Sequence, residues 1–179
     1  MGEVKSTLEL AMERARSIEV SPGEMEKLQR EQYVSKAKGM ANRYINGVLK
    51  LSGLVKEVNS YDGNARNTIV EILMFELVNA IGISVDNKGL IEAIEALRDD
   101  RVKPILGKIF KLCDDFRDKK ESQYKKVETE ITDKLRGIGI SGAAVQPKVD
   151  SHERWRHTLD TLTSDYEAKL LKLKGTLLD

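Results

Sequence analysis

The chain has 179 residues, of which 33% are charged and only 5% aromatic, and 30 Lys and Arg stand against 29 Asp and Glu. The resulting net charge of +1 excludes a strong overall field that would draw the protein to nucleic acid or anionic lipid, so any such binding must be local. High charge with only three prolines favours long solvated helices over packed sheets. We therefore expect an all-α fold, a helical bundle formed by one domain over residues 1–179.

The N-terminal part, residues 4–100, is expected to supply several helices and a core. The first predicted helix is amphipathic and covers about residues 4–18. Residues 1–10 lack the long apolar stretch and cleavage site of a secretory signal, which favours a cytoplasmic location. Ser21, Pro22 and Glu24 then form a capping box that predicts the start of a second helix.

Apolar residues continue from this start to Val58 at steps of three and four, which predicts one uninterrupted helix over residues 21–58. Gly39, Gly47 and Gly53 lie inside it, and each lowers helix stability relative to Ala. Either another helix packs closely against these glycines or the helix bends. We favour close packing.

A turn is expected at residues 61–64, followed by a core helix over residues 65–81. Its apolar run is shorter than a membrane span and contains Glu71 and Glu76, so no membrane association is expected. Glycine and polar residues at 82–89 break the pattern before a short helix at 90–97.

The C-terminal part, residues 101–179, predicts a hairpin of two long antiparallel helices with a hinge at 137–150. The first helix covers about residues 101–136, and its apolar stripe lapses at 118–121, which indicates that it leaves the core. Three pairs of opposite charge stand four residues apart along it: Asp115 with Lys119, Glu121 with Lys125 and Glu130 with Lys134. Asp150 or Ser151 is expected to cap the last helix.

Gly137, Gly139 and Gly142 in the hinge have the spacing G-x-G-x-x-G of a dinucleotide-binding loop. That loop requires a strand before it and a helix at its last glycine, whereas a charged helix precedes Gly137 here. We therefore predict no cofactor. Gly137 instead fits the left-handed position that follows a helix end.

The hinge is apolar rather than polar between Ile138 and Val145, although exposed loops rarely are. It is expected to pack on the protein's own core, or in the alternative on a partner. Trp155 belongs to the apolar stripe of the last helix, where we interpret it as a packing anchor. The candidate partner-binding residues are Ile138, Ile140, Val145 and Trp155.

Nothing in the sequence brings together the groups that catalysis needs, so we expect a protein that is not an enzyme. Cys113 lies in an apolar run and is interpreted as an inert thiol. His152 and His157 are five residues apart, so a helix does not place them on one face for a shared metal, and we predict no metal site.

Several basic residues gather on the first helix of the hairpin and are interpreted as a solvated face. They also support an alternative, a surface for nucleic acid: Lys119, Lys120, Lys125 and Lys126.

Residues 1–8 and 140–145, together with Pro147, Asp150 and Trp155, resemble a bacterial family of uncharacterised helical proteins. The resemblance implies a bacterial cytosolic protein and transfers no catalytic residue. The hairpin is also similar in shape to ribosome-associated three-helix proteins. The favoured hypothesis is a helical scaffold that docks a protein partner or self-associates, and the alternative is a protein that binds nucleic acid or the ribosome through the lysines of the hairpin.

Overall fold

The computed structural model describes residues 22–98, 100–140, 142 and 147–178, and within these ranges the protein is all-α, as predicted, with no strand. The expected helix over residues 4–18 and the capping residue Ser21 lie outside the described residues. Two single-turn 3-10 helices precede the long C-terminal helices: η1 (Asp100–Val102) and η2 (Val149–Ser151). The α-helices are α2 (Pro22–Ile45), α3 (Leu51–Val58), α4 (Gly63–Ala80), α5 (Lys88–Leu97), α6 (Lys103–Gly137) and α7 (Glu153–Leu178).

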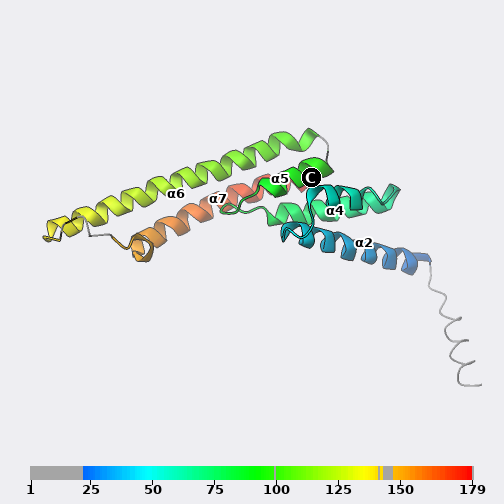
Figure 1. Ribbon diagram of the computed structural model, residues 1–179, viewed down its shortest axis with the longest axis horizontal. Helices are drawn as coiled ribbons and strands as arrows, with labels where there is room; N and C mark the ends of the chain where they lie inside the picture. The colour runs from blue at the N-terminus through cyan, green and yellow to red at the C-terminus, as the bar shows by residue number, and fades with distance from the viewer. Residues whose placement is uncertain (1–21, 99, 141, 143–146, 179) are drawn as a thin grey trace, which may run out of the picture.

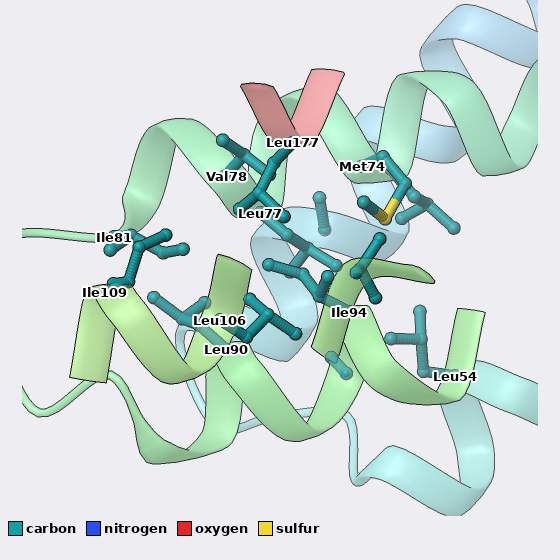
Figure 2. Packing of buried hydrophobic residues seen from close by; sticks show 14 of the residues in the cluster. Leu54, Met74, Leu77, Val78, Ile81, Leu90, Ile94, Leu106, Ile109 and Leu177 are labelled. Carbon is teal, nitrogen blue, oxygen red and sulfur yellow. The ribbon is translucent and has the colours of Figure 1, made fainter. Parts of the chain in front are cut away.

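The main core is centred on α4, whose predicted apolar run buries Ile69, Leu73, Met74, Leu77 and Val78, although Phe75 in the same run is exposed. Helix α2 packs along α4, and α5 and the C-terminal part of α7 also contact it. The first half of α6 completes this core, so the N-terminal helices and the hairpin share it. Leu54 of α3 also belongs to this core, and Figure 2 shows how it meets Leu77, Ile94, Leu106 and Leu177 there.

The predicted single helix over residues 21–58 is wrong, because the chain turns between α2 and α3. Gly47 has a φ of +72°, a left-handed conformation that glycine adopts without strain. Its N–H donates to the Tyr44 carbonyl at 2.9 Å, and the Val48 N–H donates to the Arg43 carbonyl at 2.8 Å. These two bonds form a Schellman motif, which ends α2.

Close packing of another helix on the glycines of this segment is also wrong. A Cβ at Gly39 would meet nothing within 4 Å. At Gly53 the near neighbour is the Leu49 side chain from the adjoining turn, 2.8 Å from the Cβ position. The second alternative, a change of direction, is the one that the structure has, at Gly47.

Helices α6 and α7 form the predicted antiparallel hairpin, which extends well beyond the other helices (Figure 1). Helix α6 has 35 residues, which corresponds to a length of about 52 Å. Phe116 is the last residue of α6 in the main core, so the helix leaves that core where its apolar stripe lapses. We call the part of the hairpin beyond Phe116 and Tyr166 the arm.

The arm has a small hydrophobic core of its own. Val127, Val149 and Trp155 are buried in it, with Tyr124, Ile131 and Leu159 packed around them. Helix α7 starts differently from the prediction, because neither Asp150 nor Ser151 caps it. The Arg154 N–H donates to Nδ1 of His152 at 3.2 Å instead.

Candidate functional site

The distal end of the arm, where α6 stops, has a defined backbone geometry. Gly139 has a φ of +82°, and its N–H donates to the Arg136 carbonyl at 3.0 Å. The Ile140 N–H donates to the Leu135 carbonyl at 2.9 Å. This is a second Schellman motif. The left-handed residue is therefore Gly139. The prediction of Gly137 is wrong, because α6 continues through Gly137.

Ile138 and Ile140 lie on either side of Gly139 and are both exposed, Ile138 at 72% of its surface and Ile140 at 46%. The prediction that these two side chains pack on the protein's own core is therefore wrong. Val145 lies outside the described residues. The end of the arm thus presents two isoleucines to solvent on a hydrogen-bonded turn.

Trp155, the fourth predicted partner-binding residue, is only 4% exposed and lies within the core of the arm. Its ring meets that of Tyr124 edge to face, with the ring centroids 5.1 Å apart. Arg154 beside it pairs with Glu130 across the hairpin. Trp155 is therefore a packing anchor, and the structure places it apart from the exposed isoleucines.

The four lysines of the predicted nucleic-acid surface are exposed along α6, but two of them are neutralised. Lys119 pairs with Asp115 at 3.1 Å and Lys125 with Glu121 at 2.5 Å, which are two of the predicted pairs. Within the described residues, no carboxylate pairs with Lys120 or Lys126. Glu130 forms its ion pair with Arg154, whereas Lys134 was the partner predicted for it.

A hollow of about 360 Å³, which was not predicted from the sequence, lies between α6 and the segment that joins α4 to α5. This segment, residues 81–87, lies against the side of the hairpin (Figure 1). Charged residues at the hollow are Asp86, Lys88, Asp114, Arg117 and Lys120. The other lining residues are Ile83, Ser84, Val85, Asn87, Ile91, Phe110, Cys113 and Phe116.

Asn87 fixes the shape of this segment, with only 7% of its surface exposed. Its Oδ1 accepts a hydrogen bond from the Gly82 N–H at 3.0 Å, and its Nδ2 donates to the Gly82 carbonyl at 2.7 Å. The same amide nitrogen lies 3.4 Å from Sγ of Cys113 on α6. Asn87 therefore closes the segment on itself and ties it to α6.

Burial raises the pKa of the Cys113 thiol, while the hydrogen bond from Asn87 acts in the opposite direction and the nearby Asp114 carboxylate adds to the rise. A thiol with a raised pKa is mostly protonated at neutral pH and reacts slowly. This geometry agrees with the interpretation of Cys113 as an inert thiol.

Within the described residues, no group of three His, Cys, Asp or Glu side chains is placed to hold a metal ion. None of the helices in those residues has both the length and the apolar composition needed to cross a bilayer.

No known protein family, curated protein or solved structure matches the chain. The two surfaces at the arm and the hollow must therefore be interpreted from their own chemistry.

Proposed function

We propose that the protein is a non-enzymatic helical interaction protein, which docks a protein partner or a second copy through the distal end of the arm. The observation that carries this proposal is the exposure of Ile138 and Ile140 together on the turn that ends α6. Apolar side chains exposed together on a surface are typical of protein contact sites. We call this pair of isoleucines the tip.

The build of the arm supports the same proposal. The core around Trp155 and the ion pair between Arg154 and Glu130 hold α6 and α7 together far from the main core. A surface that is rigid before binding loses less conformational entropy when the partner binds. The arm therefore suits presentation of the tip to a protein surface.

The alternative, binding of nucleic acid or the ribosome through α6, has weaker support. Carboxylates already pair with Lys119 and Lys125, so these two lysines contribute little net positive field. Lys120 and Lys126 remain as candidate phosphate contacts. Loss of a captured partner on nuclease treatment would favour this alternative.

The experiment is affinity capture from a lysate of the source cells, with and without nuclease, using wild type and the double variant Ile138→Ser/Ile140→Ser. Val48→Ser is the matched control, because Val48 is 75% exposed and follows Gly47, the left-handed residue of the first Schellman motif. Sedimentation velocity on each purified protein tests self-association in parallel.

We expect a defined protein partner, or a dimer, that survives nuclease, is lost in the double variant and is retained in Val48→Ser. The double variant should unfold at the temperature of wild type, because both side chains are exposed. An equal amount of partner on wild type and on the double variant would overturn the proposal.

A further inference from the structure

We propose that the hollow between α6 and residues 81–87 binds a small amphiphilic carboxylate, with the apolar body on the wall of the hollow and the carboxylate at its rim. This site is separate from the tip and does not depend on the proposed docking function. The proposal is based on the apolar wall, on the balance of charge at the rim, and on the fixed shape of the segment.

The wall is apolar and built from two sides. Ile83 comes from residues 81–87, Ile91 comes from α5, and Phe110 and Phe116 come from α6. Ile83 and Phe116 are buried, whereas Phe110 is more than half exposed at the open side of the hollow. A ligand with an apolar body would cover Phe110, and burial of apolar surface is the main driving force for such binding.

The rim has a positive balance of charge. The Arg117 guanidinium is paired with Asp114 at 2.8 Å. Asp86 accepts a hydrogen bond from the Lys88 backbone N–H at 3.1 Å and keeps its negative charge, so the charged residues that line the hollow have a net charge of +1. No carboxylate in the described residues pairs with the Lys88 or Lys120 ammonium groups, and both residues line the hollow. An excess of positive charge beside an apolar wall is complementary to one anionic group attached to an apolar body.

The size and preformed shape indicate a small molecule. The volume of about 360 Å³ lies at the lower end of the range for small-molecule sites. Asn87 holds residues 82–87 closed by its two hydrogen bonds to Gly82, so the wall exists before the ligand arrives. A ligand without an apolar body would leave the apolar wall uncovered.

The single cysteine of the chain provides the assay, because Cys113 lines the hollow and no other thiol contributes to the signal. We would measure the rate at which iodoacetamide alkylates Cys113 in the full-length protein at pH 8.5 while octanoate is added. Glutathione in the same solutions corrects for direct effects of octanoate on the reagent. The neutral 1-octanol has the same number of carbon atoms and tests the contribution of the carboxylate.

Two variants separate the components of the site, and a third is their control. Lys88→Gln/Lys120→Gln removes the unpaired charges, and Phe110→Ser removes an exposed part of the wall. Lys126→Gln is the matched control, because Lys126 is an exposed lysine of α6 that no carboxylate pairs with in the described residues and that does not line the hollow.

We expect octanoate to slow alkylation in a saturable manner and 1-octanol to protect less well. The double lysine variant should raise the half-protecting concentration of octanoate about five-fold, the size expected for exposed charge pairs, and leave that of 1-octanol unchanged. Phe110→Ser should weaken protection by both compounds, and Ile138→Ser/Ile140→Ser should leave it unchanged. Absence of saturable protection, or an equal loss in Lys126→Gln, would overturn the proposal.

Discussion

The hydroxyl of Tyr166 on α7 donates a hydrogen bond to the carboxylate of Asp115 on α6, at the level where the main core ends and the arm begins. Tyr166 is buried, and its ring packs against that of Phe116 with the centroids 5.4 Å apart. Lys119 pairs with the same carboxylate at 3.1 Å, and its Nζ lies 5.4 Å from the centre of the Tyr166 ring. This cluster joins the two long helices at the base of the arm.

The first prediction concerns the hydroxyl of this tyrosine. Tyr166→Phe keeps the ring in the core and removes only the hydrogen bond to Asp115, so we expect the melting temperature to fall by about 3 °C. Thermal unfolding followed by circular dichroism measures it. Tyr33→Phe is the control, because the Tyr33 ring packs on Tyr61 and its hydroxyl forms no hydrogen bond in the described residues. Equal shifts in the two variants would contradict the prediction.

The second prediction concerns acid. Hydrogen bonds from Tyr166 and Lys119 hold the pKa of the Asp115 carboxyl below its ordinary value. A carboxyl whose pKa is lower in the folded state stabilises the protein above its unfolded pKa, about 3.9, and that stabilisation is lost as the pH falls through the folded pKa. The melting temperature of wild type should exceed that of Asp115→Asn at pH 7, and the difference should shrink below about pH 4.

The matched comparison repeats this measurement in the Tyr166→Phe background. One of the two donors to the carboxylate is then absent, so the pH-dependent part of the difference should be smaller. A difference between wild type and Asp115→Asn that grows on acidification would have the wrong sign.

The fold class and most helices could be predicted from the sequence, because apolar spacing reports directly which face of a helix is buried. The break between α2 and α3 was missed. Tyr44, Val48 and Leu51 keep a helical spacing through the turn, although Val48 is exposed. The signal that marks this break is the Asn46–Gly47 dipeptide, which is typical of turns, whereas Gly39 follows a lysine and stays helical.

The candidate sites were less accessible to sequence reasoning. Ile138 and Ile140 were identified, but their exposure depends on where the turn at Gly139 directs the chain. The hollow was missed because it combines Asn87 with Cys113, which are 26 residues apart in the chain. The one available signal was Asn87 itself, a polar residue in a break between two apolar helices, and its partners are settled only by tertiary packing.

The third prediction contrasts two glycines of the same stretch. Gly139→Ala forces a Cβ into a left-handed conformation and should lower the free energy of unfolding by about 1 kcal/mol. Gly137 belongs to α6, and a Cβ there would meet nothing within 4 Å. Gly137→Ala should therefore raise stability by a few tenths of a kcal/mol, roughly the helix-propensity gain reduced by its place at a helix end. Urea unfolding measures both, and effects of equal sign would refute the assignment of the turn.

The fourth prediction tests whether the arm has a core of its own. Trp155→Ala removes the largest side chain between α6 and α7 beyond Tyr166, at a cost of about 3 kcal/mol. Hydrogen exchange should accelerate in residues 124–131 and 153–159 and stay slow in α4, which belongs to the main core. Leu54→Ala is the comparison, because Leu54 lies in the main core and its loss should speed exchange in α4. Unchanged exchange in the arm of Trp155→Ala would mean that the arm does not depend on this core.

The last prediction follows from the environment of Cys113. Desolvation raises the pKa of its thiol more than the hydrogen bond from Asn87 lowers it. Because the thiolate is the nucleophile, the rate of alkylation should reach half of its maximum at a higher pH than the rate for N-acetylcysteine amide measured alongside. Phe110→Ser opens the hollow one helical turn from Cys113, so water should reach the sulfur and the midpoint should move towards that of the free thiol. A midpoint at or below that of N-acetylcysteine amide in the wild type would mean that the sulfur is solvated, and that residues 81–87 do not cover α6 at Cys113.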